Sequence, residues 1–282
     1  MKSAYLKHID ERNKEDLPPL ALNAQQVQKI VEKLVSDVDT DFYVDLLVNR
    51  VPPGVDEAAY VKAGFLSSVA KGDQVCESID QERATFLLGT MMGGYNIDPL
   101  IDLLDITETQ QAACDALSST LLIYEAYQTV LDKSHNNPYA KKIIDAWSNA
   151  EWFTSKKELP QEIKLTVFRV EGEINTDDLS PATVAWSRPD IPLHAKSMLT
   201  KKINDPISVI ANLKDNGLPL AFVGDVVGTG SSRKSAINSV LWHMGNDIDY
   251  VPNKRTGGVI LGGKIAPIFF NTAEDSGALP IE

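Results

Sequence analysis

The chain has 282 residues, 43% hydrophobic and 23% charged, a composition that is typical of a globular protein and excludes a disordered one. Its formal net charge is −12, and the acidic excess lies mainly in residues 1–160, which hold 15 Lys and Arg against 25 Asp and Glu. Residues 161–282 hold 12 against 14. The acidic first part disfavours generic binding to nucleic acid backbones, which relies on clustered cations.

The length accommodates one large domain or two ordinary ones. No run of 18 apolar residues occurs, so we expect no membrane span. The first 16 residues are densely charged and lack the apolar core of a signal peptide. We therefore expect a cytoplasmic protein.

The first part of the chain is predicted to form successive helices. Asn23 and Gln26 have the spacing of a capping box, and one apolar stripe follows them. Asp56 is predicted to begin a further helix, with Gly72 as its C-terminal cap. Further helices are expected at residues 80–91, 98–105, 108–131 and 138–152. The spacing is that of stacked antiparallel helix pairs and favours a HEAT-like α-helical array.

A polar linker is predicted at residues 153–161, because Pro160 precedes a change of periodicity. Strands are then expected near 163–170, 207–211, 220–223, 250–251 and 258–261. Two helices are expected near 193–202 and 232–244. The sequence thus predicts α + α/β architecture, with a helical domain at residues 1–155 and a mixed β/α domain at residues 156–282.

The most informative segment is residues 224–235, which read GDVVGTGSSRKS. Glycines between an apolar run and a predicted helix allow the backbone to approach a ligand, and the N-terminus of a helix favours an anion. Arg233 could add a bidentate contact to a carboxylate. Neither a Walker A loop nor a dinucleotide fingerprint fits, since Arg233 occupies the glycine position that each requires. The alternative is a serine-capped helix with a solvated Arg233.

The sequence shows no complete set of metal ligands. The two cysteines, Cys76 and Cys114, are too few for an iron–sulfur cubane, which needs several thiolates. Cys114 lies in an alanine-rich stretch and is interpreted as a small core residue. The four histidines are scattered, without the spacing of metal ligands.

Residues 224–235, called the glycine loop below, resemble the Gly-x-Gly-Ser-Ser-Arg substrate loop of the aconitase superfamily's swivel domain. A wider resemblance, over nearly the whole chain, is to the aconitase B family (bacterial bifunctional aconitate hydratase 2 / 2-methylisocitrate dehydratase). It is carried by residues 49–66, 93–97, 175–181, 185–190 and 262–272. This resemblance implies a HEAT-like domain followed by a swivelling β/β/α domain that is incomplete at its C-terminus.

The resemblance also implies roles for particular residues. Ser231 would be the general base, and Ser231, Ser232 and Arg233 would bind substrate carboxylates. Arg188 matches a further substrate-binding arginine. The loop at residues 175–178 would line the cleft, the alternative being an Asx-type turn. Trp186 is interpreted as a residue that packs this region.

Family members interconvert citrate and isocitrate through cis-aconitate with a [4Fe–4S] cluster. We expect no cofactor to be bound by this chain, and no activity without cluster-bearing domains or a cluster-bearing subunit. The chain would be the N-terminal part of such a lyase of the tricarboxylic acid cycle, or the small subunit of a two-chain hydro-lyase. The alternative is a non-catalytic regulatory paralogue that dimerises or binds messenger RNA. A homodimer through the helical domain is expected in either case.

Overall fold

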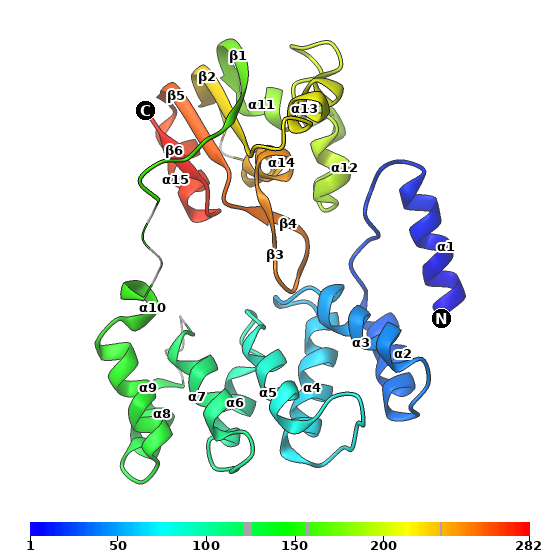
Figure 1. Ribbon diagram of the computed structural model, residues 1–282, viewed down its shortest axis with the longest axis vertical. Helices are drawn as coiled ribbons and strands as arrows, with labels where there is room; N and C mark the ends of the chain where they lie inside the picture. Colours follow the sequence, from blue (N-terminus) through cyan, green and yellow to red (C-terminus); the bar gives the residue numbers. More distant parts are fainter. Residues whose placement is uncertain (121–125, 156–157, 159, 232) are drawn as a thin grey trace. The chain divides into compact units, whose positions relative to one another are not determined.

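The computed structural model describes residues 1–120, 126–155, 158, 160–231 and 233–282 (Figure 1). Backbone contacts divide the chain into two compact units. The helical unit comprises Ala21–Leu159 with Tyr250–Pro252. The C-terminal unit comprises Lys2–Leu20, Pro160–Asp249 and Asn253–Glu282. A helical region and a parallel-sheet region thus form the two parts of the fold.

The helical unit is built from short helices whose apolar faces pack on their neighbours. Its helices are α2 (Ala24–Val35), α3 (Thr40–Asn49), α4 (Glu57–Lys71), α5 (Gln81–Gly89), α6 (Ile97–Leu103), α7 (Gln110–Ser118), α8 (Tyr127–Ser134), α9 (Pro138–Ser148) and α10 (Glu151–Thr154). Successive pairs such as α4 with α5 and α8 with α9 lie against each other. The predicted capping box at Asn23 and Gln26 is confirmed.

Helix α4 begins and ends as its sequence predicts. The Asp56 carboxylate accepts hydrogen bonds from the backbone N–H groups of Ala58 and Ala59, and Gly72 closes the helix with φ 81°. The single helix expected at residues 108–131 is wrong, because α7 already ends at Ser118. The stretch 121–125 lies outside the described residues.

The C-terminal unit contains a four-stranded parallel sheet in the order β1-β2-β5-β6. Its strands are β1 (Thr166–Asn175), β2 (Leu220–Thr229), β5 (Val259–Ile265) and β6 (Leu279–Ile281), with a separate ribbon of β3 (Asn246–Ile248) and β4 (Val251–Thr256). Its helical segments are α1 (Lys2–Asn13), α11 (Thr176–Leu179), η1 (Ala182–Ser187, a 3₁₀ helix), α12 (Ile191–Ala195), α13 (Pro206–Lys214), α14 (Lys234–Met244) and α15 (Pro267–Asp275).

The core of this unit lies between the sheet and its helices. Phe222 on β2, Ile237 on α14 and Ile260 on β5 are fully buried within one apolar cluster. Because β2 is a central strand, its apolar run is buried on both faces, whereas β1 alternates buried and exposed residues. Strand β2 continues through the first glycines of the loop to Thr229 and is therefore longer than expected.

The strand expected at residues 207–211 is wrong, because these residues belong to α13. The Asp205 side chain accepts a hydrogen bond from the Ser208 backbone N–H, and Pro206 occupies the first turn. Both features favour a helix start, and they outweigh the β-branched residues that follow. Helix α12 is shorter than the expected span of 193–202. Among the described residues, none of the helices combines the length and apolar character needed to cross a bilayer.

Gly228 and Gly172 form a matched pair for testing how tightly the loop packs. Both have positive φ, 80° and 76°, but an added Cβ at Gly228 would lie 2.2 Å from Cγ of Phe269, whereas nothing lies within 4 Å of one at Gly172. We expect Gly172→Ala to cost about 1 kcal/mol of unfolding free energy through backbone strain. Gly228→Ala should cost about 2–4 kcal/mol, because overlap with Phe269 adds to the strain. Denaturant unfolding of both variants checks this, and equal losses would contradict it.

Candidate functional site

The candidate site lies at the carboxyl ends of β1 and β2. These strands are parallel neighbours in which Asn175 is paired with Thr229, so the segments that leave them start side by side. The carboxyl edge of a parallel sheet is where ligands of α/β proteins commonly bind. The glycine loop after β2 and the loop after β1 therefore meet. The Thr176 hydroxyl donates a 2.7 Å hydrogen bond to the backbone carbonyl of Ser231, which is 55 residues further along the chain.

The loop after β1 is a capped helical turn. The Asn175 side chain accepts hydrogen bonds from the backbone N–H groups of Asp177 at 2.8 Å and Asp178 at 2.9 Å, and Asp178 Oδ2 accepts one from the Asn175 N–H. The Asx-type turn considered from the sequence is therefore present. It fixes the backbone of α11 and leaves the Asp177 carboxylate free to bond elsewhere.

Helix α14 begins directly after the glycine loop. Its N-cap residue is Arg233 in extended conformation, and the Arg233 side chain makes no capping hydrogen bond. The alternative of a serine-capped helix with a solvated Arg233 is wrong, because the N-cap residue is Arg233 itself and its guanidinium pairs with Asp177. Ser231 is exposed. Ser232, the second predicted carboxylate ligand, lies outside the described residues.

The Arg233 guanidinium is held by an acidic partner. Its Nη1 donates to Asp177 Oδ1 at 2.8 Å and to the Ser180 carbonyl at 2.9 Å. Asp177 also accepts from Lys201 Nζ at 2.8 Å and from the Ala182 N–H at 2.8 Å. The hydrogen bond from Lys201, then those from Arg233 and Ala182, hold the pKa of Asp177 well below its usual range. Two cations, Lys201 and Arg233, thus share the single Asp177 carboxylate.

Arg188 differs from Arg233 in its partners. It follows η1, and its Nε is buried yet has no hydrogen-bond partner among the residues that the structure describes. A buried donor without a partner is costly, and a bound anion would satisfy it. Trp186, two residues earlier, is 73% exposed, so the expectation that it packs this region is wrong.

A buried hydrogen-bond chain, which the sequence did not predict, connects the segments that carry the two arginines. His194 Nε2 lies 2.7 Å from Ser180 Oγ, and its Nδ1 lies 2.8 Å from Ser187 Oγ. Ser180 Oγ is also 2.7 Å from Ser235 Oγ on α14. Ser187 directly precedes Arg188, and the Ser180 carbonyl holds Arg233. The three members Ser180, Ser187 and His194 are at most 5% exposed.

The chain of donors determines which nitrogen of His194 carries the proton. The Ser187 hydroxyl donates to the Val184 carbonyl at 2.8 Å, so its oxygen must accept from Nδ1–H of His194. Nε2 then accepts from the Ser180 hydroxyl, whose oxygen accepts from Ser235. Burial first, and then the positive charge of Arg188, lower the pKa of His194, although the Val184 carbonyl acts in the opposite direction. Burial therefore favours the neutral imidazole, which this arrangement of hydrogen bonds accommodates.

The thiols do not fit the iron–sulfur cluster that the resemblance implies for the full enzyme. Cys76 and Cys114 are both free and buried in the helical unit. Sγ of Cys76 lies 3.4 Å from Ser78 Oγ, whereas Sγ of Cys114 is 3.5 Å from the Tyr139 carbonyl oxygen. Two thiols with separate partners cannot supply the three or four ligands of a cubane. Among the described residues no group of His, Cys, Asp and Glu is arranged to hold a metal ion.

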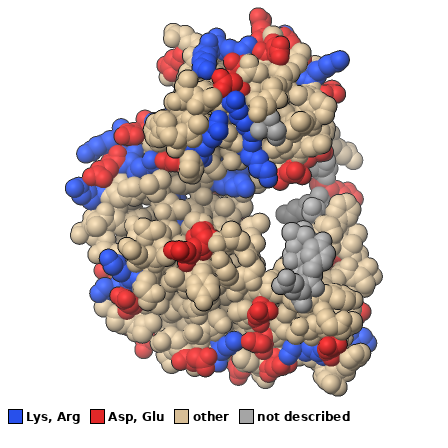
Figure 2. Space-filling view, turned by 180° about the vertical axis from the view of Figure 1, so that it is seen from behind, with Lys and Arg blue, Asp and Glu red and all other residues tan. Residues whose placement is uncertain are grey.

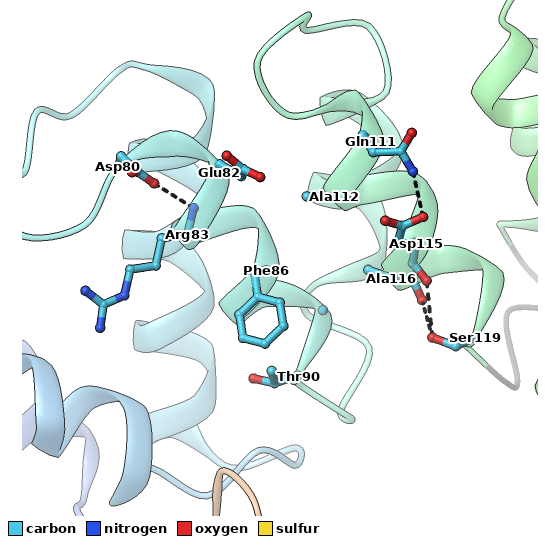
Figure 3. Close-up of a pocket in the computed structure, with 11 residues that line it drawn as sticks. Asp80, Glu82, Arg83, Phe86, Thr90, Gln111, Ala112, Asp115, Ala116 and Ser119 are labelled. Carbon is cyan, nitrogen blue, oxygen red and sulfur yellow. Dashed lines mark hydrogen bonds between the residues drawn. The ribbon is translucent and has the colours of Figure 1, made fainter. Parts of the chain in front are cut away.

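A hollow of about 600 Å³ lies between α5 and α7 of the helical unit (Figure 3). Two of its polar side chains bond locally: Asp80 accepts from the Arg83 N–H, and Gln111 donates to Asp115 at 2.7 Å. Figure 2 shows Lys and Arg side chains gathered instead on the visible face of the C-terminal unit, interspersed with acidic ones. The sequence-predicted anion-binding residues Arg188 and Arg233 both belong to the C-terminal unit.

Comparison with known proteins matches both parts of the chain. The family described as Aconitate B N-terminal domain matches residues 4–153, and the family described as Aconitate hydratase 2 N-terminus matches residues 165–282. Aconitate hydratase B of Synechocystis sp. PCC 6803 is 59% identical over the whole chain, which covers 33% of that protein. Aconitate hydratase B of Escherichia coli K12 is 55% identical, and the chain covers 34% of it. The chain thus spans about a third of the length of these curated relatives.

We expect the stability of the C-terminal unit to depend on pH because of a second buried histidine, His243. Nε2 of His243 lies 3.0 Å from the Ala195 carbonyl, and burial is the main reason that its pKa falls to about 4. Because this is below the ordinary value of 6.5, the unfolded state binds the extra proton as pH falls. Stability is fully present above pH 6.5 and is lost towards pH 4, by up to about 3 kcal/mol from this group.

Hydrogen exchange of α14 amides between pH 7 and pH 4 measures this loss. His243→Gln should reduce the pH dependence, since it removes the titrating ring. The control His135→Gln changes an exposed histidine of the helical unit and should leave it as in the wild type. An unchanged pH dependence in His243→Gln would contradict the assignment.

Proposed function

Because this chain belongs to the aconitate hydratase B family, we propose that it supplies the carboxylate-binding part of a hydro-lyase site that interconverts citrate and isocitrate through cis-aconitate. The cluster that this chemistry uses would come from residues outside these 282, since the two thiols here do not fit it. The role proposed for this chain is to bind and orient the tricarboxylate and to hold the serine base.

The observation that carries the proposal is the buried, unpartnered Nε of Arg188. A guanidinium presents Nε and one Nη as a planar fork that matches the two oxygens of a carboxylate. Binding a substrate carboxylate would therefore satisfy the buried donor and pair the charge in one step. Asp190, on the same loop, is already engaged by Arg12 and is not available as an internal partner.

Arg233 supports the proposal in a different way. Its Nη1 is used by Asp177 and the Ser180 carbonyl, which orient the guanidinium before any ligand arrives. Such preorganisation lowers the entropic cost of binding. The remaining donors of the fork would then take a second carboxylate, while Lys201 pairs with the same Asp177 carboxylate.

Ser231 is the proposed base. A serine hydroxyl removes a proton from carbon only if its alkoxide is stabilised by nearby positive charge and N–H donors. The exposed Ser231 lies three residues before Lys234, the first residue of α14, and the N-cap residue Arg233 makes no side-chain capping bond. The helix dipole and the neighbouring Arg233 would lower the pKa of this hydroxyl.

Calorimetric titration of the chain with tricarballylate tests the proposal. We expect a dissociation constant on the order of 1 mM, because this chain supplies only some of the ligands. Arg188→Ala and Arg233→Ala should each weaken binding about tenfold or more, since each removes a charge-assisted contact. The control Arg255→Ala removes a cation of the same unit that pairs with Asp247, and it should leave the affinity unchanged. Wild-type affinity in Arg188→Ala would refute the proposed role of that residue.

A further inference from the structure

The N-terminal segment Lys2–Leu20 belongs to the C-terminal unit although it is farthest from it in sequence. It consists of α1 and a return through Pro18 and Pro19. Tyr5 and Leu17 are buried at 3% exposure, and His8 Nε2 accepts a hydrogen bond from the Leu20 N–H at 3.0 Å. The segment is therefore folded and packed, in spite of its charged sequence.

Arg12 is the strongest polar anchor of this segment. Nη1 donates to Asp190 Oδ2 at 2.7 Å and Nη2 to Asp190 Oδ1 at 3.1 Å, a bidentate pair. Its Nε donates to the Pro18 carbonyl at 2.8 Å. The two side chains are only 12% and 15% exposed, so water competes little for this pair. Planar bidentate pairs that are shielded from water are stronger and more directional than ordinary surface pairs.

The ion pair holds the loop that carries Arg188. Asp190 lies two residues after Arg188, and its carboxylate also lies 3.4 Å from the Leu193 N–H in the first turn of α12. One residue before Arg188, the Ser187 hydroxyl bonds to the buried His194. Arg188 is thus anchored on both sides, by the core of the unit and by the N-terminal segment.

Further contacts keep the segment in place beyond this pair. Lys196, directly after α12, donates to the Glu15 carbonyl, and Asn253 Nδ2 donates to the Pro19 carbonyl at 2.9 Å. These bonds fix the backbone on the C-terminal side of Arg12. Loss of the Arg12 side chain would therefore release the Arg188 loop without detaching the whole segment.

We propose that Arg12 is a positioning residue for the anion site: by clamping Asp190, it holds the guanidinium of Arg188 in the orientation that a carboxylate ligand needs. The inference rests on the proposed function only for the identity of that ligand. Arg12 acts through Arg188. The more the Arg188 side chain is ordered in the free protein, the less conformational entropy is lost when the ligand binds.

The test compares Arg12→Gln and Arg12→Lys with Arg255→Gln in the 282-residue chain. The control breaks another arginine–aspartate pair of the same unit, in which Arg255 Nε lies 2.8 Å from Asp247. The first measurement, without ligand, is the hydrogen-exchange rate of the Arg188 Nε–H by NMR. The second is the affinity for tricarballylate by calorimetry.

We expect the Arg188 Nε–H to exchange about tenfold faster in Arg12→Gln, and tricarballylate affinity to fall about fivefold. Arg12→Lys keeps the charge but not the fork, so it should lie between Arg12→Gln and the wild type. Arg255→Gln should change neither quantity. If Arg12→Gln does not fold, Arg12→Lys and Asp190→Asn carry the same comparison.

Wild-type exchange at Arg188 in the Arg12 variants would overturn the inference. So would exchange that accelerates equally across the C-terminal unit and equally in Arg255→Gln, since Arg12 would then be only a general stabiliser. If exchange at Arg188 responds as expected but the wild type does not bind tricarballylate, the positioning role stands and the proposed ligand is wrong.

Discussion

The buried chain Ser187–His194–Ser180–Ser235 is the constraint on which the candidate site depends. The Ser187 hydroxyl donates to the Val184 carbonyl, so Nδ1 of His194 carries a proton, and with a neutral ring Nε2 accepts from Ser180 and Ser180 accepts from Ser235. The cost of leaving a buried polar group unsatisfied makes such a network specific. It ties the segment before Arg188 to the segments around Arg233, although these lie far apart in sequence.

The two arginines that the network connects differ in how their guanidinium groups are paired. Arg233 is oriented by Asp177, which also pairs with Lys201, so one carboxylate preorganises two cations. Arg188 keeps a buried donor without a partner among the described residues. In the proposed site, a ligand carboxylate would take the donor that Arg188 leaves unpartnered, and the fixed Arg233 guanidinium would take a second carboxylate.

Local signals in the sequence predicted the elements that local interactions determine. The cap at Asn23, both ends of α4 and the helix after the glycine loop follow from side-chain chemistry within a few residues. Helix α1 was not predicted, because its charged sequence hides the few residues that it buries. His194 was noticed only as a histidine without metal-ligand spacing. Its role depends on hydrogen bonds to Ser180 and Ser187, and no local sequence pattern predicts a bond to Ser180, which is 14 residues away in sequence.

The most direct test of this account is the tautomer of His194, read from long-range ¹H–¹⁵N NMR correlations of histidine side chains at pH 6 to 7. The account predicts a neutral ring with its proton on Nδ1, because the Ser187 hydroxyl is committed to the Val184 carbonyl. Ser180→Ala should change the Nε2 shift and leave the proton on Nδ1. A neutral ring with its proton on Nε2 would contradict the network and with it the coupling of the two arginine segments, and a charged imidazolium in this pH range would contradict the lowered pKa of the buried ring.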